Sequence, residues 1–118
     1  MKFTLKNAQE FGWDGLSGWA FNAKEDFPRA SAAYFEITGQ HGETKATESD
    51  RIYYVIDGEG EFMMNGETIK VGKSDVFVAP KNTTYDYKAV VGVLKMFLVH
   101  TPAFDSDKEV TLDLNNNN

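Results

Sequence analysis

Apolar residues along this chain come in short bursts that are separated by glycine, asparagine, aspartate and lysine. This spacing is typical of many short β-strands, because an amphipathic helix would repeat its apolar positions every three or four residues. The pattern therefore predicts an all-β fold. The expected strands cover residues 18–21, 32–38, 44–47, 52–57, 60–65, 67–71, 75–79, 85–89 and 93–100.

Turn signals separate these bursts, and Asn65-Gly66 is the strongest of them. Both central residues of a type I′ turn need positive φ, which Asn and Gly tolerate, so a hairpin is predicted here. Gly58-Glu59-Gly60 is expected to be a second turn between strands. Residues 22–30, which contain Pro28 and mixed charges, predict a loop or one short helical turn.

A chain of 118 residues with 42% apolar residues is long enough for one core and too short for two ordinary domains. We expect one β-barrel domain over residues 1–104, with an N-terminal strand segment at 1–30 and a core at 32–102. Residues 105–118 are polar and finish in four asparagines, so they predict a frayed tail without a functional role.

Charge and cysteine content limit the classes of function. With 12 basic and 18 acidic residues, the net charge is −6, which disfavours nucleic acid and anionic membranes as partners. Zero cysteines exclude a disulfide scaffold, thiolate catalysis and cysteine-based metal sites. The chain contains neither a run of 18 apolar residues nor a recognisable signal peptide, so a cytoplasmic location is expected.

Two spaced frames lie in the middle of the chain. The first consists of Gly39, Lys45, Thr47, Arg51 and Gly58, and the second consists of Ser74, Pro80, Asn82, Tyr85 and Ala89. Their spacing resembles the two motifs of the cupin family. Those motifs read Gly, five residues, His, one, His, three or four, Glu, six, Gly; and Gly, five residues, Pro, one, Gly, two, His, three, Asn. The resemblance implies a cupin-type antiparallel β-sandwich or jelly-roll barrel.

In cupins, the three histidines and the glutamate of these motifs converge on a divalent transition metal. The matching positions here hold Lys45, Thr47, Arg51 and Tyr85. Sites for such metals are normally built from imidazole, carboxylate and thiolate groups, and this set supplies none of them. The sequence therefore predicts no metal and no cofactor at the family site.

The altered positions suggest a different ligand. Side chains alternate along a strand, so Lys45, Thr47, Arg51 and Tyr53 can share one face, and Tyr85 and Tyr87 can share another. Buried cations need a wet cavity, an acidic partner or a bound anion. The predicted ligand is a small anionic or polyhydroxylated molecule, such as a carboxylate or sugar derivative. The predicted binding residues are Lys45, Thr47, Arg51, Tyr53, Tyr85, Tyr87 and His100.

Two further interpretations stay open. The protein is alternatively an isomerase, epimerase or lyase in which Tyr85 or His100 transfers a proton, while Arg51 and Lys45 stabilise an enolate or a carboxylate. It is otherwise a non-catalytic structural subunit, with the tyrosines in the core. Arg51 would then be paired with an acidic residue, for which the candidates are Glu36, Glu43 and Glu61.

The remaining candidates are histidines and aromatic residues. His100 ends an apolar run and is the preferred functional histidine, whereas His41 lies in an expected loop. A metal site shared by the two is the less favoured interpretation. Trp13, Trp19 and Phe21 predict core or dimer contacts, with a carbohydrate-stacking platform as the minor alternative. A homodimer is expected, in which a paired or exchanged N-terminal strand covers an open sheet edge.

Overall fold

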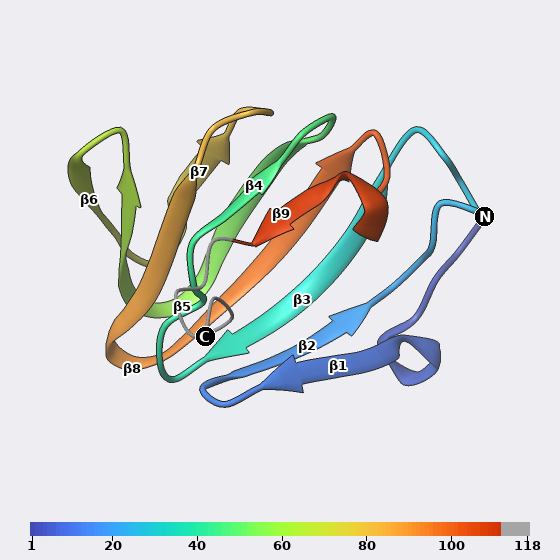
Figure 1. The fold of residues 1–118 in the computed structure, drawn as a ribbon. Helices are drawn as coiled ribbons and strands as arrows, with labels where there is room; N and C mark the ends of the chain where they lie inside the picture. Colours follow the sequence, from blue (N-terminus) through green and yellow to red (C-terminus); the bar gives the residue numbers. More distant parts are fainter. Residues whose placement is uncertain (112–118) are drawn as a thin grey trace.

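The computed structural model describes residues 1–111 as one curled antiparallel sheet, which confirms the all-β prediction (Figure 1). The strands are β1 (Gln9–Trp13), β2 (Leu16–Ala20), β3 (Ser31–Ile37), β4 (Thr44–Ala46), β5 (Asp50–Met64), β6 (Glu67–Val71), β7 (Val76–Ala79), β8 (Tyr85–Thr101) and β9 (Glu109–Thr111). Two 3-10 turns accompany them, η1 (Leu5–Asn7) and η2 (Ser106–Lys108). None of the described helices is long and apolar enough to cross a membrane.

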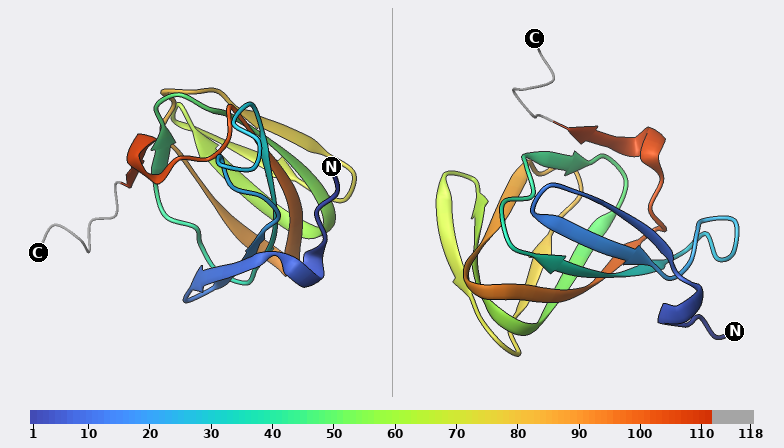
Figure 2. Two further views of the ribbon diagram at one scale, coloured as in Figure 1. Left: turned by 90° about the vertical axis from the view of Figure 1, so that its right-hand side faces the viewer. Right: turned by 90° about the horizontal axis from the view of Figure 1, so that it is seen from below.

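The long strands β5 and β8 join the two halves of the barrel. The first part of β5 pairs with β7 and with the end of β8, which continues through β3 to β2 and β1. The second part of β5 pairs with β6 and with the start of β8, where Tyr85 pairs with β4, and β4 pairs with β9. Strands β4 and β9 lie together on one side of the barrel, and the sheet curls around the interior (Figures 1 and 2).

The turn predicted at residues 58–60 is wrong, because these residues stay within β5. The register of β5 against β8 shifts between Val55 and Gly60, and Gly58 has a φ of 81°. Such bulges bend a strand without ending its pairing, which is why two predicted strands are one. The same holds for β8, which continues through Gly92 at a φ of 68°. The Asn65-Gly66 turn is confirmed, with φ values of 54° and 76°.

Substituting Gly58 tests the importance of this bend. A Cβ at Gly58 would overlap the carbonyl oxygen of Val93, and its positive φ disfavours any side chain. We expect Gly58→Ala to lower the free energy of unfolding by about 3 kcal/mol in urea titrations. Gly66→Ala is the matched control, because its φ is also positive but nothing lies within 4 Å of the added atom, so about 1 kcal/mol is expected. Equal losses in both variants would contradict the role of the Val93 contact.

Both ends of the described chain differ from expectation. Strand β1 was not predicted, and β1 and β2 pair with each other and with β3 of the same chain. Part of the predicted polar tail is structured, since η2 is followed by β9, whose backbone pairs with β4 over Thr44–Ala46. The frayed-tail prediction is therefore wrong for residues 105–111. Residues 112–118, with the four asparagines, lie outside the described part.

Candidate active site

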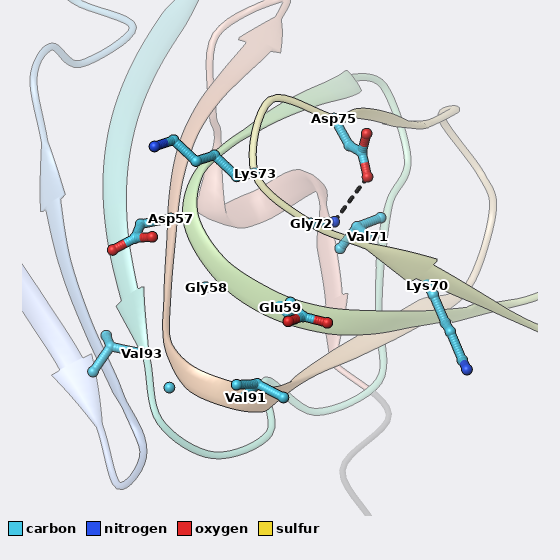
Figure 3. A pocket seen from close by; sticks show the side chains of 11 residues that line it. Asp57, Gly58, Glu59, Lys70, Val71, Gly72, Lys73, Asp75, Val91 and Val93 are labelled. Atoms are coloured by element: carbon cyan, nitrogen blue, oxygen red, sulfur yellow. Dashed lines mark hydrogen bonds between the residues drawn. The ribbon is translucent and has the colours of Figure 1, made fainter.

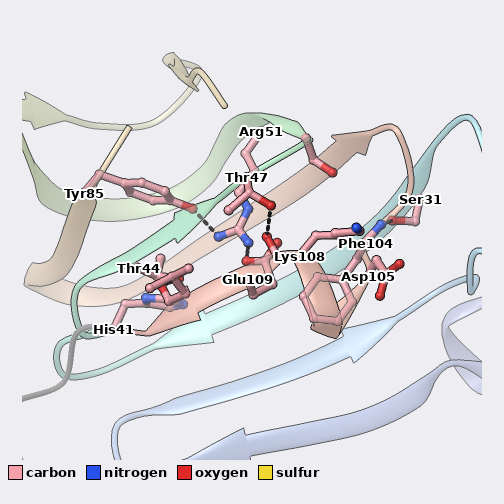
Figure 4. A network of polar contacts seen from close by, with 12 residues as sticks. Ser31, His41, Thr44, Thr47, Arg51, Tyr85, Phe104, Asp105, Lys108 and Glu109 are labelled. Atoms are coloured by element: carbon pink, nitrogen blue, oxygen red, sulfur yellow. Dashed lines mark hydrogen bonds and ion pairs between the residues drawn. The ribbon is translucent and has the colours of Figure 1, made fainter. Parts of the chain in front are cut away.

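Arg51 lies inside the barrel near the start of β5 and is only 4% exposed. One terminal nitrogen, Nη1, donates a hydrogen bond to the Tyr85 hydroxyl at 2.5 Å, and the other forms an ion pair with the carboxylate of Glu109 (Figure 4). The remaining nitrogen, Nε, is buried and finds no hydrogen-bond partner in the part of the chain that the structure describes. Arg51 therefore joins a phenol from β8 to a carboxylate from β9.

Three buried phenols extend from Arg51 into the core. The hydroxyls of Tyr85 and Tyr53 lie 2.6 Å apart, and the ring of Tyr87 lies 5.3 Å from that of Tyr53. All three side chains are essentially inaccessible to solvent. The Tyr87 hydroxyl is buried and has no hydrogen-bond partner within residues 1–111, which is unfavourable because such a hydroxyl has lost its hydrogen bonds to water. We call Tyr53, Tyr85 and Tyr87 the phenol row.

His41 stacks on Tyr87 of the phenol row. Its ring lies 4.6 Å from that of Tyr87 at an interplanar angle of 23°, and its backbone N–H donates to the Tyr87 carbonyl at 2.8 Å. Asp86 fixes the same loop, since its carboxylate accepts from the Gln40 amide at 2.5 Å and from the Gly42 N–H at 2.8 Å. The loop that carries His41 is thus hydrogen-bonded to Asp86 of β8 on both sides of the histidine.

Hydrogen bonding selects the tautomer of His41. Its Nδ1 lies 2.8 Å from the carbonyl oxygen of Gly42, and a carbonyl can only accept, so Nδ1 carries the hydrogen. Nε2 is then the basic nitrogen. Burial lowers the pKa of His41 below 6.5, which keeps the imidazole neutral at pH 7. Burial also raises the pKa of Tyr53, Tyr85 and Tyr87, so the phenols stay protonated and can donate hydrogen bonds.

Glu109 is held in place by the backbone around it. The Lys108 carbonyl accepts hydrogen bonds from the Thr47 N–H at 2.8 Å and the Thr47 hydroxyl at 2.9 Å, and Ala46 pairs with Glu109 between β4 and β9. Upstream, the Phe104 N–H donates to the Ser31 hydroxyl at 2.8 Å (Figure 4). The partner of Arg51 thus comes from the segment to which no function was assigned.

The predicted acidic partners of Arg51 were wrong. The Glu36 carboxylate accepts a hydrogen bond from Tyr34 at 2.8 Å, and Glu61 lies 3.7 Å from the Lys88 ammonium. Glu43 is exposed and lines a surface pocket beside the β5–β6 hairpin. Glu109 could not be found from the sequence, because a three-residue strand in a polar segment gives no distinct pattern.

The structure brings together four of the seven predicted binding residues in one network: Arg51, Tyr53, Tyr85 and Tyr87. Lys45 and Thr47 do not join them, because in β4 the buried side chains are those of Thr44 and Ala46. The residues between β4 and β5 interrupt the alternation of side chains. Odd-numbered side chains in β4 therefore do not face the same side as odd-numbered side chains in β5. The prediction of Lys45 as a second interior cation was therefore wrong.

His100 is also inside the barrel, beside Arg51 in the register between β5 and β8. Its nearest aromatic neighbour is Phe104, with ring centroids 5.4 Å apart. Burial, followed by the positive charge of Arg51, lowers the pKa of His100 to about 3. A histidine with so low a pKa remains neutral at pH 7 and is a weak base, so His41 is the better candidate for proton transfer.

The low pKa of His100 predicts a pH dependence of stability. Between pH 6.5 and about 3 the unfolded chain binds a proton at His100 that the folded chain does not, so this contribution is full above pH 6.5 and falls on acidification. The loss should reach several kcal/mol at pH 3. Urea unfolding of wild type and His100→Gln between pH 7 and 4 should show the steeper decline in wild type. An NMR titration of the His100 ring near pH 6.5 would contradict the assignment.

Two surface pockets lie away from this network. One, of about 640 Å³, is lined by Asp57, Glu59, Lys70, Lys73 and Asp75 around the bend in β5, where the Asp75 carboxylate accepts the Gly72 N–H (Figure 3). The other, of about 600 Å³, lies by the β5–β6 hairpin and residues 82–84. Neither pocket is lined by a predicted binding residue. Within residues 1–111, no three His, Cys, Asp or Glu side chains come together as a metal-binding group.

Comparison with known proteins identifies the class. Residues 35–100 match the family described as "Cupin domain", so the chain belongs to the cupin family. This confirms the family resemblance and the cupin-type barrel. None of the curated proteins matches the chain.

Solved structures give particular relatives. The chain is similar to Pac13, described as "a unique nucleoside dehydratase", with 26% identity and a TM-score of 0.84, over 96% of this chain and 91% of that one. Variants of Streptomyces Pac13 have been solved with uridine, and in these one of two tyrosines is replaced by phenylalanine, or a histidine by glutamine. KdgF from Halomonas sp. has a TM-score of 0.75 and 20% identity, over 89% of this chain and 94% of that one, which shows a shared fold.

Proposed function

We propose that this cupin binds a neutral, polyhydroxylated molecule of the nucleoside type against His41 and the phenol row, and that it removes water from it as a lyase. The observation that carries the proposal is the buried Tyr87 hydroxyl, which has no hydrogen-bond partner among the described residues and lies next to a neutral, stacked imidazole. A ligand oxygen or hydroxyl would supply the missing partner. Enzyme sites commonly hold such unpaired donors ready for a substrate.

The order of residues supports a Pac13-like substrate. The substituted residues in the uridine-bound Pac13 variants are a histidine followed by two tyrosines that lie 34 positions apart. In this chain His41 precedes Tyr53 and Tyr87, which are also 34 positions apart. The histidine precedes the first tyrosine by 13 positions in Pac13 and by 12 here. The two chains align over nearly their whole length, which supports similar places for these residues in the barrel.

The charge of the interior favours a neutral ligand over an anion. The ligand expected from the sequence is anionic or polyhydroxylated, and Glu109 of the same chain already supplies a negative charge to Arg51. An anionic ligand would have to displace this carboxylate or share the interior with it, at a cost in desolvation and repulsion. The polyhydroxylated alternative needs neither, because phenols and imidazole bind hydroxyl and carbonyl groups directly.

The proposed chemistry is a β-elimination. Nε2 of His41 removes a hydrogen from a carbon next to a carbonyl, since a neutral imidazole is too weak a base for an unactivated C–H bond. The electrons of that C–H bond form a C=C bond as the neighbouring C–O bond breaks. The departing hydroxide takes the proton from the His41 imidazolium and leaves as water, which restores the neutral histidine. The protonated phenols stabilise charge that develops on the carbonyl oxygen.

Ligand binding tests this proposal. We expect isothermal titration calorimetry to show binding of uridine to wild type, and Tyr87→Phe to weaken it about five- to tenfold, since one hydrogen bond contributes roughly 1 kcal/mol. Tyr54→Phe is the matched control, because Tyr54 is an exposed tyrosine of β5 on the outer face, and its affinity should equal that of wild type. Absence of uridine binding at millimolar concentration, or equal losses in both variants, would leave the structural-subunit interpretation.

A further inference from the structure

The outer face of the sheet carries an apolar surface that is separate from the interior. In the register of the sheet, Phe97, Tyr54 and Val76 form one row across β8, β5 and β7, and Val99, Ile52 and Val78 form the next. These side chains alternate with the buried ones, so they point away from the barrel interior. We call Ile52, Tyr54, Ile56, Val76, Val78 and Phe97 the outer patch. Each of the six is between 36% and 60% exposed.

The outer patch continues onto β3 and β2. Tyr34 follows Phe97 in the same row, and Trp19 stacks on Tyr34 with ring centroids 5.6 Å apart. Phe21 lies 6.2 Å from Phe97. The apolar row therefore crosses five strands. The six side chains of the outer patch are uncharged.

The area of the outer patch fits a symmetric dimer. At these exposed fractions the six side chains present roughly 400–500 Å² of apolar surface, which is within the range of the largest patch on a monomeric protein, a patch that is often functional. A standard interface buries about 800 Å² per partner, and homodimer interfaces are about 65% apolar, which gives about 500 Å² of apolar surface. One copy of the patch thus supplies the apolar part of a standard two-fold interface.

We propose that the outer patch is the face through which two copies of this chain associate, sheet against sheet. Two antiparallel sheets pack well when their apolar faces meet at a small angle, as in a β-sandwich. A two-fold axis needs a face that is complementary to itself, and the six side chains of the outer patch are uncharged. The next row of the sheet holds Glu36, Lys95 and Asp57, so both signs of charge border the patch. The packing also covers the outer face of β7, which among the described strands pairs only with β5.

This face is an alternative to the one expected from the sequence. The N-terminal strands were expected to pair across the dimer; β1 and β2 pair within their own chain, and β1 is an edge strand among residues 1–111. The proposal is also independent of the function proposed above. The outer patch lies on the side of β5 and β8 opposite to Arg51 and the phenol row, so dimerisation and uridine binding can fail separately.

Sedimentation velocity on matched double variants tests the proposal. Val76→Lys/Val78→Lys places two charges in the outer patch, whereas Val90→Lys/Val91→Lys makes the same change at two equally exposed valines near Gly92. At 10–100 µM protein, we expect a dimer for wild type and for the Val90/Val91 variant. The Val76/Val78 variant should have a dimer dissociation constant at least 100-fold higher. Circular dichroism checks that both variants are folded.

Cross-linking gives a second measurement that does not depend on weakening the interface. The chain has no cysteine, so Tyr54→Cys places a single thiol in the middle row of the patch. A short bismaleimide should link this variant into dimers, and a cysteine at Val91 should not be linked. A monomeric wild type at 100 µM, a dimer that survives the Val76/Val78 charges, or loss of the dimer in both lysine variants would overturn the proposal. A monomer that binds lipid vesicles through Val76 and Val78 would assign the face to a membrane instead.

Discussion

Replacing Glu109 by glutamine is expected to lower the free energy of unfolding by about 3–5 kcal/mol, because it leaves Arg51 buried without a counter-charge. Removing one partner of a buried ion pair lowers the free energy of unfolding by far more than the net contribution of the pair, since the remaining charge cannot reach water. The loss is a large fraction of the stability of a domain of this size. Urea denaturation at pH 7 followed by tryptophan fluorescence measures it.

A surface carboxylate provides the control for this measurement. Glu48 lies 3.6 Å from the Lys108 ammonium, and both side chains are well exposed, so Glu48→Gln should change the stability by less than about 0.5 kcal/mol. Arg51→Met/Glu109→Gln removes both charges and should be more stable than the sum of its single variants predicts. Millimolar acetate should stabilise Glu109→Gln more than wild type, because it can return a carboxylate to Arg51. If Glu109→Gln behaves like Glu48→Gln, the ion pair does not support the barrel.

Substituting His41 is expected to have the largest effect on activity. His41→Gln keeps the size and polarity of the side chain but removes the basic nitrogen, so turnover should fall by about 10²- to 10⁴-fold while the free energy of unfolding changes little. The assay follows the ultraviolet absorbance of the conjugated carbonyl that elimination creates in a carbonyl-bearing nucleoside. Wild-type activity should persist below pH 6.5 and fall only at more acidic pH, because the pKa of His41 is lowered by burial.

His100 is the matched comparison for His41. Both rings are largely buried, but only His41 stacks on Tyr87, whereas His100 lies beside Arg51. His100→Gln should therefore leave turnover within a few-fold of wild type and should change the pH dependence of stability instead. If His100→Gln abolishes turnover and His41→Gln does not, the catalytic base was assigned to the wrong histidine.

Features that depend on local sequence were predictable. The Asn65-Gly66 hairpin follows from the conformational preference of two residues, and it formed as predicted. The shared inward direction of Arg51 and Tyr53, and of Tyr85 and Tyr87, follows from the alternation of side chains within one uninterrupted strand. The resemblance of the residue spacing to the cupin motifs predicted, in addition, that these two stretches come together in a barrel.

Features that depend on distant pairing could not be predicted. Lys45 was placed inside because the alternation was carried across the residues between β4 and β5, where the backbone is no longer extended. Glu109 was missed because its position depends on β4 pairing with a three-residue strand more than 60 positions away. His41 was undervalued because its stacking on Tyr87 depends on Asp86 fastening its loop, which no local pattern reveals.

The position of Arg51 gives the barrel interior a positive charge that belongs to the chain itself. Arg51 occupies the motif position at which other cupins place the glutamate ligand of a metal, and Tyr85 occupies that of a histidine. The interior thus contains a positive centre that is covalently part of the chain, because a guanidinium stays charged at every physiological pH. Unlike a bound ion, such a centre cannot be extracted by chelators or exchanged with competing ions.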